Sequence, residues 1–305
     1  MLKFGNTYLN FGGTYLDGWT AYIDPNPLNL PTNTMRVRCY PGTELSSKSD
    51  IFQLTKVGME GDCPIYDIVT NENKWGGLAE GIIASANGLP KVGISDILGV
   101  NNSAISSVYA MFYWSEMGVP AGRTVAFSSM SSICYFDMSN VVKAEDWFNG
   151  LYSLTGLPKY NTSSVTSFSE SFIDTNIPQP ITLDCRSCVN LNDAFYYYGD
   201  GSYGFPDLKN TNNVSSWGYT FDSVAKSTAL ASKQVVIPDY DFSNAKNVSN
   251  TFRDNFYVSG GISSTYAKLS ALGNQVTAHS RCFYGCGVSS EQGRAELALI
   301  PSDWK

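Results

Sequence analysis

Side chains able to do chemistry are few and poorly grouped in this sequence of 305 residues. The one histidine, His279, excludes zinc sites built on several histidines and argues against most base-activated nucleophiles. Cys185 and Cys188 form a CxxC motif, but the other close pair, Cys282 and Cys286, is spaced differently and lies far along the chain. Structural zinc needs two pairs at suitable spacing. We therefore expect no metal and no cofactor.

Paired carboxylates are the remaining catalytic candidates, because two of them can hydrolyse a glycosidic bond. Glu145 with Asp146, and Asp239 with Asp241, are nominal pairs in cap or turn contexts, where a solvated carboxylate is the simpler interpretation. Calcium at Asp239 and Asp241, or around Asp200, is disfavoured because no loop has densely spaced oxygen ligands. The motifs of serine hydrolases, zinc proteases, phosphate loops and dinucleotide sites do not occur. We expect a protein that is not an enzyme, with a glycan hydrolase as an open alternative.

Composition and charge exclude further classes of function. Lys and Arg number 20 against 27 Asp and Glu, a net charge of -7, so the basic footprint of nucleic-acid binding is missing. The longest uncharged run, 97–115, is broken by Asn and Ser and makes a poor membrane span. Seven irregularly spaced cysteines do not form a disulfide framework. The first residues lack the features of a signal peptide, so we expect synthesis in a cytosol without ordinary export.

A repeat runs through the last two thirds of the chain. Each unit has an apolar residue, a second one three positions later and a Phe four positions after that, as in Val165, Phe168 and Phe172. This spacing places the three on one face of a helix, and the Ser or Asn before the first is typical of an N-cap. Short apolar stretches at 154–157, 181–183, 205–208 and 235–237 suggest strands between the helices. The anchors are Phe112, Phe148, Phe172, Phe195, Phe221, Phe252 and Phe283.

The anchors are 23 to 36 residues apart, within the range of solenoid repeats. One helix–strand unit cannot bury its apolar stripe alone, whereas stacked units can. The sequence therefore predicts an α/β fold, a leucine-rich-repeat-like solenoid of short helix–strand units over 95–305 with a C-terminal cap. An ordinary α/β domain with unrelated amphipathic helices is the alternative.

The repeat resembles a known family. Residues 137–172, DMSNVVKAEDWFNGLYSLTGLPKYNTSSVTSFSESF, are similar to BspA-like leucine-rich repeats, and FYGC at 283–286 matches the end of such a unit. The tail GVSSEQGRAELALIPSDWK resembles the closing segment of BspA-like proteins in phages and prophages of gut bacteria. The resemblance covers about 95–290. Ala144, Trp217 and His279 depart from it where Met or Leu is usual, and Cys188 replaces Val.

The first third of the chain has a different pattern. FGNTYL and FGGTYL form a local duplication that predicts an N-terminal arm or β-hairpin within 1–30. The alternating segment 34–40 and the stretches 51–57 and 63–69 predict strands of a small β domain over 31–94. The opening residues also resemble those of phage virion proteins, with less specificity than the repeat.

Aromatic residues follow several anchors and suggest a binding surface, because Tyr and Trp are enriched in binding hot spots. The segment AFYYYGDGSYGF, 194–205, is the densest cluster, with glycines that make the loop pliable. Some of these rings could instead fill gaps between repeats. The candidate ligand-binding residues are Tyr113, Trp114, Tyr196, Tyr197, Tyr198, Tyr203, Phe256 and Tyr257.

The resemblance implies a non-enzymatic structural protein of a phage virion, in the tail, baseplate or a head fibre. Its repeats would recognise a host-surface glycan or protein, and its β region would dock onto other virion proteins. Such parts are usually homo-oligomers, which suggests a trimer, assembled in the host cytoplasm and released by lysis. A bacterial surface adhesin of the same repeat family, a tail-associated glycan depolymerase and a capsid decoration without a receptor are the alternatives.

Overall fold

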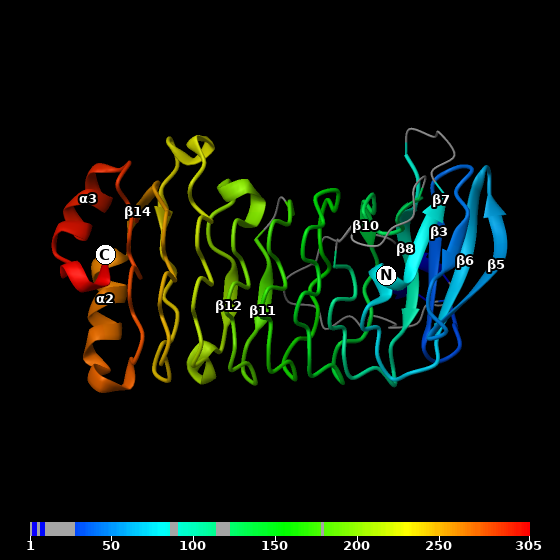
Figure 1. Cartoon of the computed structure of the whole chain (residues 1–305), viewed down its shortest axis with the longest axis horizontal. Coiled ribbons are helices and arrows are strands. Elements are labelled where there is room, and N and C mark those ends of the chain that lie inside the picture. The colour runs from blue at the N-terminus through cyan, green and yellow to red at the C-terminus, as the bar shows by residue number, and fades with distance from the viewer. Residues whose placement is uncertain (1, 5–6, 10–27, 86–90, 114–122, 178–179) are drawn as a thin grey trace.

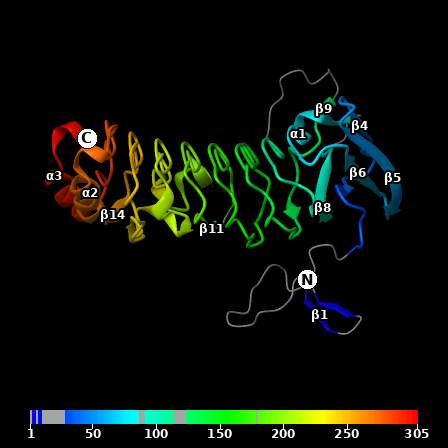
Figure 2. The same ribbon diagram turned by 90° about the horizontal axis from the view of Figure 1, so that it is seen from below.

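The computed structural model describes residues 2–4, 7–9, 28–85, 91–113, 123–177 and 180–305. The described body is elongated, with a β-rich end, a middle of similar transverse segments and a helical end (Figures 1 and 2). Strands β1 (Leu2–Phe4) and β2 (Thr7–Leu9) pair as an antiparallel hairpin within the expected arm.

A five-stranded sheet forms the β-rich end. Its order is β10-β8-β3-β6-β5, and β3 lies antiparallel to both β6 and β8. Buried and half-buried residues alternate along β6, as expected for a strand with one face on the core. The strands are β3 (Thr34–Cys39), β5 (Phe52–Glu60), β6 (Cys63–Thr70), β8 (Ile94–Asn101) and β10 (Ser132–Ile133).

Smaller elements complete this end. A three-stranded antiparallel sheet joins β4 (Leu45–Ser47), β7 (Ile82–Ser85) and β9 (Arg123–Val125), and α1 (Leu78–Gly81) leads into β7. Strand β8 crosses the expected boundary at 94, and β10 lies well inside the repeats. The sheet and the repeats therefore share one hydrophobic core.

The predicted solenoid of helix–strand units is wrong. The described residues contain three α-helices, and none of them carries the Phe motif. The motif residues form turns, and the strands between them make only small separate sheets instead of a continuous solenoid sheet. Two-stranded parallel sheets pair β11 (Thr182–Asp184) with β12 (Asp207–Lys209), and β13 (Val235–Val236) with β14 (Val258–Gly260).

Left-handed residues explain why the motif is not helical. The fifth position after the first apolar residue has positive φ in every unit, for example Glu170 at 59° and Asp193 at 56°. An α-helix cannot continue through that conformation. The amide of Phe168 donates to Asn190 O at 3.0 Å, and that of Phe172 to Ala194 O at 2.8 Å. These two donors thus bond to the next unit and not to a carbonyl four residues back.

These bonds place successive units side by side. Single parallel bridges link the residue before the second apolar position of each unit to its equivalent in the next. The series begins at Lys74, one unit before the first that the sequence suggested, with Trp75 at the apolar position. The bridged residues are Lys74, Ser107, Lys143, Ser167, Asn190, Ser216, Asn247 and Ala278.

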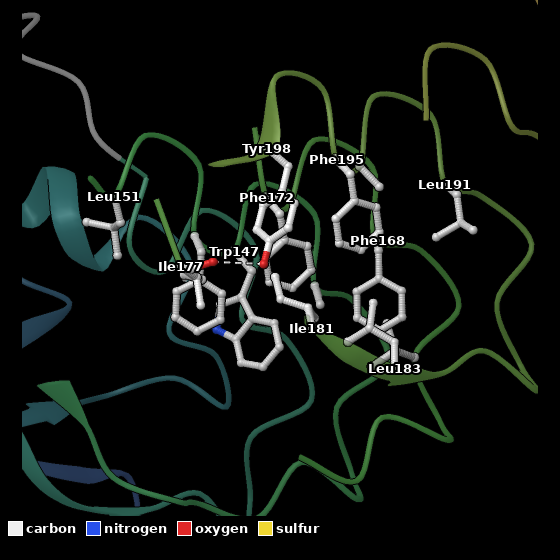
Figure 3. Packing of buried hydrophobic residues seen from close by; sticks show 14 of the residues in the cluster. Trp147, Leu151, Phe168, Phe172, Ile177, Ile181, Leu183, Leu191, Phe195 and Tyr198 are labelled. Atoms are coloured by element: carbon white, nitrogen blue, oxygen red, sulfur yellow. Dashed lines mark hydrogen bonds between the residues drawn. The ribbon is translucent and has the colours of Figure 1, made fainter. Parts of the chain in front are cut away.

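The seven anchor rings are fully buried and stacked in order. Phe172 and Phe195 lie 5.1 Å apart at 6°, and Phe252 and Phe283 lie 5.5 Å apart at 7°. The remaining neighbouring pairs have centroids 5.4 to 6.1 Å apart. Figure 3 shows Phe172 and Phe195 on adjacent segments, with Phe168 nearby. One shared ring column thus replaces the helical stripes that the spacing predicted.

Two helices that the sequence did not predict, α2 (Ile262–Ala271) and α3 (Glu291–Ala298), form the far end of the body (Figure 1). The Trp304 carbonyl accepts the amide of the last anchor, Phe283, at 2.9 Å.

The 3-10 turns are Tyr198–Gly201, Thr211–Asn213, Thr228–Leu230, Gly273–Gln275 and Ser302–Trp304. In the described part of the chain, none of the helices reaches the length and apolarity required to cross a bilayer.

Candidate binding surface

The residues considered for catalysis or metal binding make packing or hydrogen-bond contacts within the folded chain. His279 stacks on Trp304, with ring centroids 4.3 Å apart and planes at 9°. Cys185 and Cys188 are both buried, and the hydrogen bond between their thiols, followed by burial, raises the pKa of Cys185. A protonated, buried thiol is a poor nucleophile and metal ligand.

The carboxylate pairs have local partners as well. The Asp146 carboxylate accepts a hydrogen bond from Asn149 at 3.0 Å, and burial raises its pKa. The Lys268 ammonium contacts the Asp239 carboxylate and also donates to Tyr240 O at 3.1 Å. Asp241 accepts the Ser243 amide at 2.9 Å. Lys268 thus already pairs with Asp239, one of the two aspartates.

Three of the rings predicted to bind a ligand pack against other residues of the chain instead. Tyr198 is fully buried, and its hydroxyl donates to Ile177 O at 3.0 Å (Figure 3). The Tyr203 hydroxyl donates to Asn176 Oδ1 at 3.0 Å, and its ring meets Tyr198 edge-on. Tyr257 is partly buried against the core. Assigning Tyr198 to ligand contact is therefore wrong, and the other two fill space beside the repeats.

The remaining candidates divide into two places. Tyr113 is half-buried beside the first anchor, and Trp114 lies outside the described residues. Tyr196, Tyr197 and Phe256 are half-buried and come from neighbouring stretches of the repeat region. Only these last three are brought together.

A lysine joins these rings. The Lys226 Nζ lies 5.5 Å from the Tyr197 ring centroid and 5.8 Å from that of Phe256. Tyr196 lies beside Tyr197, with centroids 6.3 Å apart. We call Tyr196, Tyr197, Lys226 and Phe256 the ring–cation cluster. Such a group presents apolar ring area together with ammonium donors.

An ion pair supports one side of the cluster. Arg253 Nε lies 2.8 Å from Asp222 Oδ2, and the guanidinium lies 5.5 Å from the Tyr219 ring centroid. Burial raises the pKa of Asp222 to about 6, although Arg253 opposes the shift. Burial, and next the charge of Asp222, raise the pKa of Tyr196. The cluster and the pair are therefore electrostatically connected.

Sequence reasoning found the rings but missed Lys226, Asp222 and Arg253. Each contacts a residue of another unit, so no local spacing marks it. Because neighbouring units lie side by side, a cationic residue one unit after an aromatic residue can contact that ring. This spacing was the signal in the sequence that could have indicated these contacts. Arg253 comes one unit after Tyr219, and Lys226 one unit after Tyr197.

A row of acidic residues precedes the cluster along the repeats. Asp146, Glu170 and Asp193 occupy the left-handed position of three successive units. Burial, and then the charges of Asp146 and Asp193, raise the pKa of Glu170. Tyr109 lies close enough to Asp146 for that charge to raise the pKa of its phenol. Three carboxylates therefore lie along the repeats up to the unit of Tyr196 and Tyr197, and Asp222 and Asp254 lie beyond it.

No family model, curated protein or solved structure matches this chain.

Proposed function

We propose that this chain is a non-enzymatic structural protein of a phage virion, in the tail, baseplate or a head fibre, and that its repeat region recognises the host surface. The observation that carries the recognition role is the ring–cation cluster. The virion role rests on the resemblance of 137–172 and 283–286 to BspA-like proteins of phages. The partner of the cluster is a host-surface glycan or protein.

The cluster suits recognition because its parts are held by a rigid support. Tyr197 donates its amide to Asp222 O at 3.0 Å, and a Cβ atom added at Gly285 would come within 3.2 Å of the Phe256 ring. The side chains therefore need little ordering when a partner binds, which lowers the entropic cost of association. Aromatic and cationic groups on rigid elements are typical of binding hot spots.

The β-rich end is the part we assign to docking on other virion proteins. It lies at the opposite end of the body from α2 and α3 (Figure 1). A chain attached through this end would leave the ring–cation cluster accessible. Assembly in the host cytoplasm and release by lysis follow from the same proposal.

Immunogold electron microscopy of virions tests the virion role. Antibody against this chain should label particles at one structure, either the tail or the head. Particles that carry no label above preimmune serum would contradict the proposal.

Adsorption measurements test the recognition role. Virions carrying Tyr197→Ala with Lys226→Met should adsorb to host cells about tenfold more slowly, because both ring and charge are lost. Tyr152→Ala is the matched control, since Tyr152 is 49% exposed and lies outside the cluster. Equal adsorption of all three virions would show that the cluster does not contribute to host recognition.

A further inference from the structure

The left-handed residues at the fifth position after the first apolar residue form one row across the repeats, here called the outer row. The amide of each donates to the carbonyl of the residue preceding the next member, as in Asp146 to Ser169 O at 3.0 Å and Tyr219 to Ser249 O at 3.0 Å. The row therefore keeps the chain order in space. Its members are Ala110, Asp146, Glu170, Asp193, Tyr219, Asn250 and Arg281.

Charge is divided between the two halves of the outer row. Asp146, Glu170 and Asp193 come first, and Arg281 is last. Arg253, three residues after Asn250, adds no free cation to the last half, because it is paired with Asp222 and lies 3.7 Å from Asp254. Among the described residues, neither Asp146 nor Glu170 has a cation within salt-bridge distance, and Arg281 has no carboxylate partner. Each half of the row thus carries charge that no described residue pairs, Asp146 and Glu170 in the first half and Arg281 in the last.

We propose that the outer row docks against the outer row of a second copy of this chain in antiparallel orientation. A twofold axis between Asp193 and Tyr219 places the unit of Asp146 in one copy opposite the unit of Arg281 in the other. Asp146 then faces Arg281 of the second copy, and the symmetric contact repeats the pair. Glu170 comes opposite the unit of Asn250.

Electrostatics selects this orientation. A parallel arrangement would place Asp146, Glu170 and Asp193 against the same carboxylates of the other copy, and like charges across an interface are strongly unfavourable. The net charge of -7 opposes association at long range. At physiological ionic strength the screening length is about 8 Å, so this repulsion is screened while contact pairs persist.

The contact is small. Units that stack like strands lie about 4.8 Å apart, so the five steps from Asp146 to Arg281 extend about 24 Å. A narrow strip of that length buries less area than a stable dimer needs. The pairing is therefore weak in dilute solution and matters where copies are concentrated, as on an assembled particle. It is separate from any oligomer formed through the β-rich end.

Charge reversal with complementation tests the pairing. Sedimentation of the full chain up to millimolar concentration should show a monomer–dimer equilibrium. Arg281→Glu and Asp146→Arg should each weaken it about tenfold or more, because both copies then oppose like charges. An equimolar mixture of the two variants should dimerise again, since each mixed pair has opposite charges. The left-handed backbone tolerates arginine at position 146, because Arg281 adopts the same conformation.

Lys233→Glu is the control for the change in net charge, because Lys233 is exposed and lies outside the outer row. It should leave the equilibrium unchanged. A wild-type chain that stays monomeric throughout, or a mixture that fails to dimerise, would overturn the pairing. Host adsorption is a separate readout, so this result leaves the proposed recognition role to its own test.

Discussion

Arg253 Nε lies 2.8 Å from Oδ2 of Asp222, a carboxylate with no exposed surface. The ion pair does not fully offset the cost of removing this carboxylate from water, because burial still raises its pKa to about 6. Ser223 adds a hydrogen bond from its hydroxyl to Asp222 Oδ1 at 2.8 Å. The pair lies beside the ring–cation cluster and connects the stability of that surface to pH.

The raised pKa of Asp222 predicts a stability that falls as pH rises. The folded state holds the proton more tightly than the unfolded state, whose pKa is near 3.8. The stabilisation of the folded state by this proton is complete below about pH 4 and is lost as pH rises through 6. From the two pKa values it amounts to about 3 kcal/mol at most. Urea unfolding at pH 4.5 and 7.5 should show a smaller pH difference for Asp222→Asn than for wild type.

Other carboxylates also titrate in this range, so the comparison needs a matched variant. Asp303→Asn removes an exposed carboxylate near the end of the chain. It should retain the wild-type pH difference. If Asp222→Asn and Asp303→Asn behave alike, the buried carboxylate is not the source of the effect.

The ring column predicts a second effect on stability. Phe172→Ala should destabilise the chain by about 3 to 5 kcal/mol, because a fully buried ring between two stacked rings leaves a cavity. Phe256→Ala removes a half-buried ring and should cost much less. Chemical denaturation measures both. Similar losses would mean that the column contributes no more than peripheral packing.

The sequence was sufficient for the anchor positions because their spacing recurs and buried aromatic residues are conspicuous. It did not predict the backbone conformation. Positions i, i+3 and i+7 suit a helix, but the same spacing suits two turns separated by a left-handed residue such as Glu170. Asp and Asn at that position were a usable signal, since they tolerate positive φ better than most residues. Contacts between units, such as Lys226 with Phe256, have no signature within one unit.

The left-handed position predicts a stabilising substitution. Glu170→Gly should raise the free energy of unfolding by about 1 kcal/mol, because glycine adopts φ 59° without strain. Glu170→Val should lower it, since a β-branched residue is strained there. Glu170→Gln separates the backbone effect from the removal of a charge near Asp146 and Asp193. If glycine stabilises no more than glutamine, relief of charge repulsion explains the gain.

The end of the ring column predicts where local unfolding begins. Trp304 covers the last unit by accepting the Phe283 amide and by stacking on His279. Trp304→Ala should destabilise the chain by about 3 kcal/mol or more, since a buried aromatic side chain is removed. Hydrogen exchange should rise most in 276–286 and least near Phe148, because units contact only their neighbours and the loss propagates from the exposed end. Uniform acceleration along the whole chain would instead mean that the repeats and the β-rich end unfold as one cooperative unit.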